Sequence, residues 1–527
     1  MQTQQQVELD TLISSLVAIV GADHVLTDAA ELAFYATDIY TAGKQPRAVV
    51  QPASTDEVVA IAKLAGEHGL SLVPRGGGAS YTDGYLPTQE HSLLIDTSRM
   101  DAILDLNAED MYVTVQTGVP WAKLNDALKP LGLRTPFYGP FSGLHATVGG
   151  GVSQNSVSWG TGTFGVSAES VLGVEVVLAG GELLRTGSWG TETSTPFFRH
   201  YGPDLTGLFT GDNGALGIKT AISLRLIRRP PEFIGLSFKF PDFDSMHQGM
   251  TAAAKLGINT INFGLDPTLQ QGQLGKTSTS DAMAAALAVF KTSRNPIDGL
   301  VQVARMGMAG KRFLSAENYS CHYIVEGIDR ASVKSSAAAI RNAVAPYGAE
   351  TANTIPNVVY AMPFAPFYNV LGPKGERWVP IHCLLPFSRA VPFRRDLEQL
   401  YARHENSMRE HKIQYGAMFL SVSTNAFLYE PVFYWEDERN ACIDRMVPAD
   451  YLAQLPTYPP NPQGRALVAQ MKQEIIDLMH QHGAAHFQIG KLYPYLADRN
   501  AAAAKLLRDI KAAVDPKQGM NPGALGL

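Results

Sequence analysis

The sequence is poor in cysteine and contains no long hydrophobic run. Its 527 residues include only Cys321, Cys383 and Cys442, too few and too scattered for a disulfide framework or a thiolate metal site. No apolar run approaches the roughly 18 residues of a membrane span, and the N-terminus lacks the basic and apolar regions of a signal peptide. We therefore expect a cytoplasmic protein with no bound structural metal and no membrane partner.

A surplus of basic residues is also missing. The chain has 43 Lys and Arg against 49 Asp and Glu, a net charge of −6 with histidine neutral. This excludes a general nucleic-acid binder, whose phosphate contacts need an excess of positive charge. What the chain does have is 45% hydrophobic residues, enough to fill large cores, and its length predicts two or more domains.

The first part of the chain alternates strand and helix signals and then becomes rich in strands. Ser54 and Glu57 form a capping box before an apolar helical face that stops at Gly69. Val, Ile and Leu runs between turn residues predict strands at 47–52, 70–74, 93–96, 112–116, 174–178, 183–186 and 221–227. The segment Arg228-Arg-Pro-Pro231 then predicts a domain boundary near residue 233.

The second part is a mixed region with helical and strand-like segments. Helical periodicity occurs at 281–292, 329–346, 394–411, 464–481 and 496–513, and aromatic strand-like runs occupy 415–435. No internal repeat or low-complexity linker separates the two parts, so we expect them to pack closely. The sequence thus predicts an α+β protein.

One glycine cluster matches a dinucleotide motif by composition only. Gly160-Thr-Gly-Thr-Phe-Gly165 has the spacing G-x-G-x-x-G, but a Val-rich strand and a hairpin follow it instead of a helix. A glycine-rich turn is therefore favoured over a Rossmann fingerprint. The phosphate-binding pattern G-x-x-x-x-G-K-[ST] is absent, so the sequence does not support a P-loop nucleotide hydrolase.

Three other glycine-rich segments adjoin predicted strands. They are Arg75 to Tyr81, Val148 to Asn155 and Asp212 to Thr220. Each alone could be an ordinary turn. Together they suggest a long ligand held by main-chain amides, because glycine lets the backbone approach closely and several N–H donors can stabilise a pyrophosphate.

These segments resemble the vanillyl-alcohol oxidase/p-cresol methylhydroxylase flavoproteins over nearly the whole chain. The resemblance is carried by Val73-Pro-Arg-Gly-Gly-Gly-Ala-Ser-Tyr81, Ala146-Thr-Val-Gly-Gly-Gly-Val-Ser-Gln-Asn155, Gly202-Pro-Asp-Leu with Gly214-Ala-Leu-Gly-Ile218, and the terminal Asn521-Pro-Gly523. It implies an FAD-binding domain of two α+β subdomains at 1–233, a cap domain with an antiparallel sheet flanked by helices at 234–480, and a segment at 481–527 that returns to the FAD domain.

The resemblance also implies which residues bind FAD. They are Arg75, Gly76, Gly77, Gly78, Ala79, Ser80, Tyr81, Thr147, Val148, Gly149, Gly150, Gly151, Ser153, Asn155, Gly214, Gly217, Ile218 and Asn521. Ala79 stands where many relatives carry a flavin-linking His, and Leu428 stands at the linking position of the cap. Non-covalent FAD is therefore expected.

Candidate catalytic residues are His382, His486, Tyr429 and Arg377. A histidine with an ordinary pKa of about 6.5 can remove the proton of an alcohol while hydride leaves the carbon, and Tyr429 and Arg377 could orient substrate. A buried core histidine is the alternative for His382 and for His486. Ala485 and His486 replace the Tyr-Arg pair of the 4-phenol-oxidising branch, which argues against a simple para-phenol substrate.

The function expected from this resemblance is FAD-dependent oxidation of an activated, aromatic or benzylic alcohol by hydride transfer to flavin N5. Oxygen or an electron carrier would reoxidise the flavin, and a homodimer is an expected assembly because dimers are common in the family. One alternative is a 2-hydroxy-acid dehydrogenase of the same superfamily, which predicts a divalent metal whose H-x-G-D-G-N-x-H and E-H-G-x-G motifs are missing. The other is a ligand-binding protein without catalysis.

Overall fold

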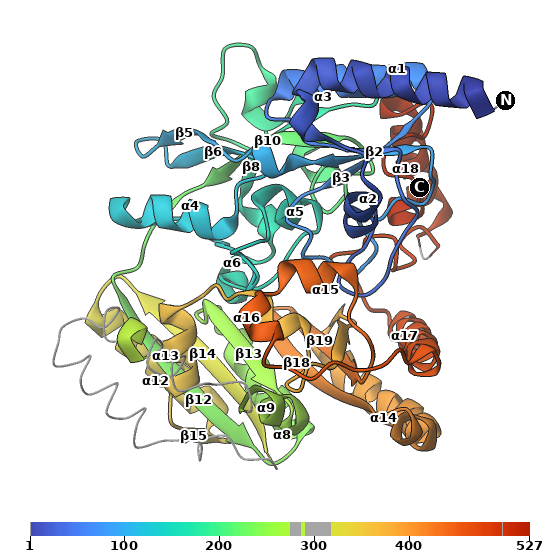
Figure 1. Cartoon of the computed structure of the whole chain (residues 1–527). Coiled ribbons are helices and arrows are strands. Elements are labelled where there is room, and N and C mark those ends of the chain that lie inside the picture. The colour runs from blue at the N-terminus through green and yellow to red at the C-terminus, as the bar shows by residue number, and fades with distance from the viewer. Residues whose placement is uncertain (1, 275–285, 290–317, 498) are drawn as a thin grey trace.

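The protein is described here from a computed structural model that covers residues 2–274, 286–289, 318–497 and 499–527. Its elements form an upper body built from the N-terminal half and the C-terminal end, and a lower body built around one large sheet (Figure 1). The helix predicted at 281–292 lies mostly outside the described residues. In the described part of the chain, no helix is long and apolar enough to cross a membrane.

The first sheet of the upper body has four strands in the order β1 (Val25–Leu26), β2 (Ala48–Val50), β4 (Ser92–Asp96) and β3 (Ser71–Arg75). Strands β2, β4 and β3 are parallel, and helix α3 (Thr55–His68) connects β2 to β3. The predicted cap at Ser54 and the stop at Gly69 are confirmed: Ser54 Oγ accepts the N–H of Glu57 at 3.2 Å, and Gly69 ends the helix at φ 64°. The second half of the predicted capping box differs, because the Glu57 carboxylate accepts the N–H of Ala53 at 2.7 Å instead of that of Ser54. Strand β3 therefore delivers Arg75 and the glycines after it to the sheet edge.

The second sheet of the upper body is antiparallel. Its five strands follow the order β5 (Ile103–Asn107), β6 (Tyr112–Gln116), β10 (Ile218–Arg225), β8 (Val171–Val177) and β9 (Leu183–Arg185). A small pair, β7 (Leu133–Arg134) and β11 (Ile227–Arg228), lies at its end. The other helices of this half are α1 (Gln2–Val20), α2 (Ala29–Tyr35), α4 (Trp121–Leu128), α5 (Val148–Ser153), α6 (Thr161–Phe164) and α7 (Leu205–Leu208).

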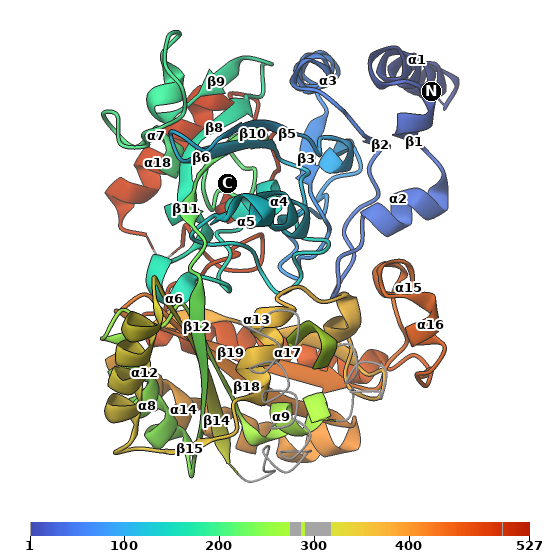
Figure 2. The ribbon, with the colours of Figure 1, turned by 90° about the vertical axis from the view of Figure 1, so that its left-hand side faces the viewer.

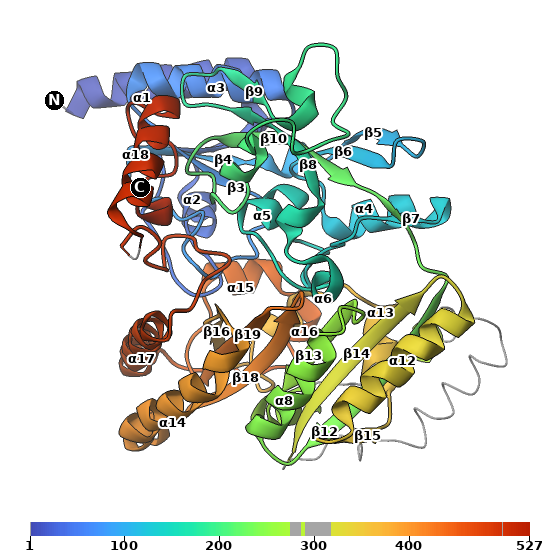
Figure 3. The same ribbon diagram turned by 180° about the vertical axis from the view of Figure 1, so that it is seen from behind.

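The lower body contains an eight-stranded antiparallel sheet, here called the cap sheet. Its order is β15 (Ala349–Thr351), β12 (Glu232–Phe240), β14 (Tyr319–Gly327), β13 (Ile261–Leu265), β18 (Ile413–Val422), β19 (Ala426–Trp435) and β16 (Arg377–Pro380), and β17 (Cys383–Leu385) also pairs with β19. Helices α8 (Phe243–Ala254), α12 (Arg330–Val344), α14 (Phe387–Glu410) and α17 (Pro462–Gln481) share its apolar core on one side (Figure 3).

The remaining helices lie in the lower body, between the two bodies or, in the case of α18, in the upper body. They are α9 (Pro267–Leu274), α13 (Thr354–Ala361), α15 (Ala441–Met446), α16 (Ala449–Leu452) and α18 (Ala501–Val514). Figure 2 shows α18 in the upper body, far in sequence from its neighbours there. The predicted α+β fold with an antiparallel cap sheet flanked by helices is confirmed.

The C-terminal segment is attached to the upper body by backbone and buried polar contacts. The N–H of Leu72 in β3 donates to Gly519 O at 2.8 Å, and the N–H of Asn521 donates to Leu72 O at 2.8 Å. Lys511, a buried residue of α18, pairs with Asp515 and donates to the carbonyl of Ala215, each at 2.7 Å. These contacts place the end of the chain beside two of the glycine-rich segments.

Candidate functional site

Three glycine-rich segments converge on one cavity of the upper body, here called the cradle. They come from the loop after β3, from α5 and from the turn before β10. Of the residues predicted to bind the cofactor, the cradle is lined by Arg75, Gly76, Gly77, Gly78, Ala79, Ser80, Thr147, Gly149, Gly150, Gly151, Ser153, Gly214, Gly217 and Ile218. Segments more than 60 residues apart in sequence are thus brought to one site.

The loop after β3 requires glycine at two positions. A Cβ on Gly77 would collide with the carbonyl oxygen of His145, and Gly78 has a left-handed φ of 67° and lies against the Arg75 guanidinium. The backbone N–H groups of residues 77–80 have no hydrogen-bond partner among the described residues. Such a run of unpaired donors is stabilised when an anion binds to it.

Two cations stand at the wall of the cradle. The guanidinium of Arg75 lies 4.7 Å from the ring of Tyr35 and 5.2 Å from that of Tyr85, which fixes its position. Lys219 pairs with Asp212 at 2.6 Å, and both side chains are buried. The unpaired N–H groups and the Arg75 cation fit a long ligand with a negatively charged centre, such as the pyrophosphate of a dinucleotide.

Four predicted cofactor residues lie off the cradle wall. Val148 is buried in the apolar core, and Asn155 accepts the N–H of Ala168 at 3.4 Å. Asn521 donates to the carbonyls of Gly84 at 3.0 Å and Asn213 at 2.7 Å, so it ties two cradle segments together from behind. The fourth residue, Tyr81, faces a second cavity.

The second cavity, here called the substrate cavity, lies between the cradle and the cap sheet. It has a volume of about 250 Å³. Its walls are Ile39, Ala79, Tyr81, Pro140, Phe141, Ser142, Val157, Ser158, Leu269, Ala365, Pro366, Phe367, Asn369, Val370, Trp378, Met418, Leu420, Leu428, Glu430, Val432, Tyr434, Phe487 and Gln488. Ala79, Pro140, Ser142 and Gln488 line both cavities, so the two are adjacent.

Aromatic side chains form part of the wall of the substrate cavity. The rings of Tyr81 and Trp378 meet edge to face, with centroids 5.5 Å apart. Tyr434 extends from β19 on the same side as Leu428 and Val432. Flat apolar walls of this kind suit a flat, apolar ligand.

One carboxyl group interrupts this apolar wall. Glu430 belongs to β19, is 8% exposed, and is the one carboxyl side chain among the described wall residues. Burial away from water raises its pKa from 4.5 to about 8. No Lys, Arg or His occurs among the same described wall residues.

The two candidate histidines lie behind the cavity wall. His382 follows β16 instead of lying in a strand, is fully buried, and stacks on Phe487 with centroids 4.1 Å apart. Burial, with the nearby His486, lowers the pKa of His382 to about 3. The Nδ1 of His486 is 3.0 Å from the carbonyl oxygen of His382, and its ring stacks on Tyr493. These positions favour packing over direct contact with a ligand in the cavity.

Tyr429 points to the opposite face of the cap sheet from Glu430. Its hydroxyl accepts a hydrogen bond from Arg394 of α14 at 3.3 Å, and its ring packs against Phe393 and Phe419. Side chains of neighbouring residues in a strand point to opposite faces, which explains this placement. In this structure Tyr429 therefore belongs to the cap core and does not reach the substrate cavity.

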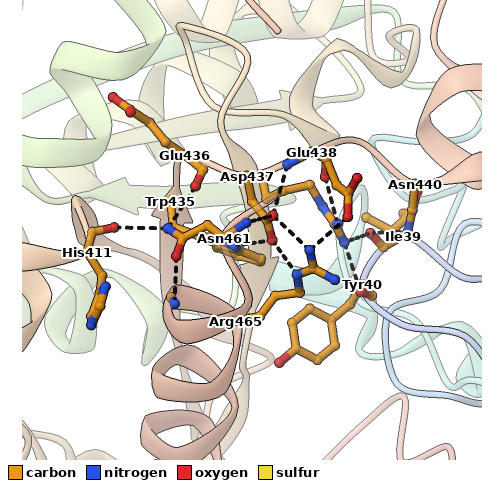
Figure 4. A network of polar contacts seen from close by, with 12 residues as sticks. Ile39, Tyr40, His411, Trp435, Glu436, Asp437, Glu438, Asn440, Asn461 and Arg465 are labelled. Carbon is orange, nitrogen blue, oxygen red and sulfur yellow. Dashed lines mark hydrogen bonds and ion pairs between the residues drawn. The ribbon is translucent and has the colours of Figure 1, made fainter. Parts of the chain in front are cut away.

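Arg377 holds the lower body to the N-terminal loop instead of facing a ligand. Its guanidinium donates to the carbonyls of Tyr40 at 2.8 Å and of Ile39 at 3.3 Å. Beside it, Arg465 pairs at 2.7 Å with Asp437, which is fully buried (Figure 4). The network fixes the loop whose Ile39 lines the substrate cavity, so the contribution of Arg377 is positional.

Sequence reasoning overlooked Glu430 and Gln488, which line the substrate cavity. Glu430 and Tyr434 lie on one face of β19, and Gln488 joins the two cavities while its backbone N–H donates to Gln154 O at 2.6 Å. The available signal for Glu430 was a single acidic residue within a ten-residue apolar strand. Groups of three or more His, Cys, Asp or Glu that could hold a metal are not found in the described residues.

Comparison with known proteins supports the interpretation of the cradle as a dinucleotide-binding site. Residues 46–187 match the family described as "FAD binding domain". The glycolate oxidase subunit GlcD of Bacillus subtilis (strain 168) is 34% identical over 226 residues, which are 42% of this chain and 46% of that protein. The chain spans about half the length of the curated relatives it matches.

Solved structures resemble the whole chain at low identity. A p-cresol methylhydroxylase with substrate bound has a TM-score of 0.73 at 18% identity, covering 99% of this chain and 97% of that one. The 4-ethylphenol oxidase from Gulosibacter chungangensis, in complex with isoeugenol, has a TM-score of 0.68 at 18% identity, covering 98% and 97%. These likenesses concern the fold, including the arrangement of the cap sheet over the upper body.

Proposed function

We propose that this chain, which is an FAD flavoprotein of the vanillyl-alcohol oxidase/p-cresol methylhydroxylase family, oxidises an activated, aromatic or benzylic alcohol carbon. The observation that carries the proposal is the adjacency of two unlike cavities: a cradle rich in backbone donors and an apolar, aromatic cavity that shares four wall residues with it. Bound FAD supplies the hydride acceptor at such a site.

The cradle residues would hold the cofactor by main-chain contacts. The N–H groups of residues 77–80 and the charge of Arg75 stabilise the pyrophosphate. Ala79 and Leu428, the positions at which relatives carry linking histidines, have side chains that cannot form a bond to flavin. We therefore infer non-covalent FAD, so the yellow colour should leave the protein on acid precipitation.

The substrate cavity would bind and orient the alcohol. Its aromatic and aliphatic walls exclude water from the reacting carbon, and Trp378 with Tyr81 limits the orientation of a flat ring. Among the described wall residues, no cation is present to pair with a substrate carboxylate. An uncharged alcohol is therefore favoured over an acid.

A 2-hydroxy acid is the second candidate, since part of the sequence is 34% identical to a glycolate oxidase subunit. That similarity covers 42% of this chain and 46% of the glycolate oxidase subunit. The described residues lack a group of metal-ligating side chains as well as a cation on the cavity wall. Both absences disfavour this candidate.

The test is anaerobic reduction of the bound flavin, followed by its absorbance. We expect benzylic and cinnamylic alcohols to bleach the flavin, and glycolate and D-lactate to leave it oxidised with or without a divalent metal. The variant Met418→Trp, which fills the substrate cavity and leaves the cradle intact, should retain FAD and lose the bleaching. Metal-dependent reduction by a hydroxy acid would overturn the proposal, and flavin that no compound reduces would favour a ligand-binding protein.

The proposal also covers the electron acceptor that reoxidises the flavin, the oligomeric state of the protein and its location in the cell. During alcohol turnover, an oxidase consumes oxygen, whereas a dehydrogenase reduces an added artificial electron carrier. Measuring both rates distinguishes the two. Light scattering of the purified protein tests for the expected homodimer. The cytoplasmic location rests on the three separate cysteines, all buried and unpaired, and fractionation of cells tests it.

A further inference from the structure

Among the buried acidic side chains of the described residues, that of Glu430 has no hydrogen-bond or ion-pair partner. Buried Asp212 pairs with Lys219 at 2.6 Å, and buried Asp437 pairs with Arg465 at 2.7 Å. The backbone of Glu430 pairs with Met418 in the cap sheet, but its carboxyl group makes no hydrogen bond or ion pair with any described residue. Its carboxyl group instead faces the substrate cavity.

A buried polar group without a partner costs free energy, and this cost must be offset elsewhere. An unpaired carboxyl in an apolar wall loses roughly 1–3 kcal/mol of hydrogen bonding to water. Apolar neighbours such as Leu428 and Val432 on the same strand face would have served packing better than an acid does. A ligand group that hydrogen-bonds the carboxyl would recover the loss.

We infer that Glu430 is the group that binds the substrate hydroxyl and receives its proton. The inference rests on the proposed alcohol oxidation and specifies the chemistry of its site. As the C–H bond breaks, hydrogen leaves with both electrons to the flavin; the O–H bond breaks with its proton going to a Glu430 oxygen, and the C=O bond forms. The proton later passes to solvent, and oxygen or an electron carrier takes the two electrons.

The surroundings of Glu430 support both its binding of the substrate hydroxyl and its acceptance of the hydroxyl proton. The ionisable side chains that its charge affects are Tyr81 from the cradle loop, Tyr434 of β19 and Tyr493 of the C-terminal segment, all with raised pKa values. With these neighbours neutral, the carboxyl titrates close to pH 8, since burial raises its pKa to about 8. It can therefore donate to a hydroxyl when protonated and accept its proton when ionised.

The same residue would select against acids. A carboxylate in the cavity would meet no positive side chain among the described wall residues, and above pH 8 it would meet the negative charge of Glu430. Two like charges in an apolar cavity repel strongly. Glu430 is thus a specificity residue as well as a proton acceptor.

The experiment compares wild type, Glu430→Gln and the matched control Glu436→Gln, all with FAD bound. Glu436 lies just beyond β19, is partly exposed and pairs with Lys412 at 2.6 Å, so its substitution removes one carboxylate and leaves the cavity unchanged. Binding of benzyl alcohol and benzoate is followed by perturbation of the flavin spectrum between pH 6 and 9. The rate of anaerobic flavin reduction is measured over the same range, and infrared spectra report the protonated carboxyl directly.

In wild type and control, we expect the reduction rate to rise to a plateau with a midpoint near pH 8, and benzoate binding to weaken across the same range. Glu430→Gln should slow reduction by about 100-fold or more, remove the midpoint and leave benzoate binding independent of pH. The carboxyl band should disappear near pH 8 in wild type and be absent in Glu430→Gln.

Two outcomes separate the inference from the proposed function. If alcohols reduce the flavin but Glu430→Gln keeps the wild-type rate and midpoint, the role of Glu430 is refuted and the alcohol oxidation stands. If no alcohol reduces the flavin, the oxidation is refuted; benzoate binding and the infrared band still test Glu430. Should Glu430→Gln fail to fold, the wild-type band decides: a carboxyl ionised throughout pH 6 to 9 overturns the inference.

Discussion

Replacing Glu430 by Gln should change how the stability of the protein depends on pH. The side chain is buried in an apolar wall, and its pKa is raised from 4.5 to about 8. A carboxyl whose pKa is raised in the folded state stabilises that state when protonated, and this contribution is lost as the pH rises through the folded pKa. Glutamine has nearly the same shape and does not titrate, so the variant should not lose this stability.

The magnitude follows from the two pKa values. Between pH 4.5 and 8 the wild type loses between 1 and 2 kcal/mol per pH unit from this one group. The difference in unfolding free energy between Glu430→Gln and wild type should therefore grow across this range by roughly 4 kcal/mol and level off above pH 8. Buried Asp38, with a pKa raised to about 7, titrates in both proteins, so its effect cancels in the difference.

The assay is urea unfolding of the FAD-bound proteins, followed by tryptophan fluorescence at one-unit steps from pH 5 to 9. The Glu436→Gln control should parallel wild type at each pH, because its carboxylate is partly exposed and lies outside the cavity. A difference between Glu430→Gln and wild type that stays constant from pH 5 to 9 would refute the reasoning, since it would mean that Glu430 titrates normally in the folded protein.

Three further predictions test other parts of the structure. Gly77→Ala should abolish retention of FAD through gel filtration, because its Cβ would collide with the His145 carbonyl, and a normal flavin content would contradict the cradle. Asp437→Ala should lower the unfolding free energy by about 3 kcal/mol, measured by urea unfolding, because the indole N–H of Trp435 loses its buried acceptor. Trp378→Ala should raise the KM for a benzylic alcohol about tenfold at unchanged FAD content, since it removes one wall of the substrate cavity.

Local elements and the cradle segments were accessible from the sequence because their signals are local. Ser54, Glu57 and Gly69 mark the ends of α3 by capping chemistry alone. The glycine-rich loops are contiguous strings whose backbone needs glycine, and the structure brings the three together. The role of Asn521 was less accessible, because it depends on contacts with Gly84 and Asn213, more than 300 residues away.

The candidate catalytic residues were harder to find because they were selected by residue type. Histidine and arginine are common in active sites, yet His382 is fully buried beside Phe487, and Arg377 is used to fix the N-terminal loop. Both arrangements arise from tertiary packing between segments far apart in sequence. No local pattern distinguishes a histidine that faces a cavity from one that lies just behind its wall.

The strand β19 carried more information than its aromatic composition suggested. Its ten residues are apolar on both faces, because Phe427, Phe433 and Trp435 pack against the cap helices while Leu428 and Val432 face the substrate cavity. A strand buried on both faces has no place where an acid is solvated, so Glu430 within it must face either a partner or a cavity. The alternation that turns Tyr429 into the core turns Glu430 toward the cavity. A charged residue within an otherwise apolar buried strand thus indicates the functional face of the sheet more directly than do histidines and arginines selected by residue type.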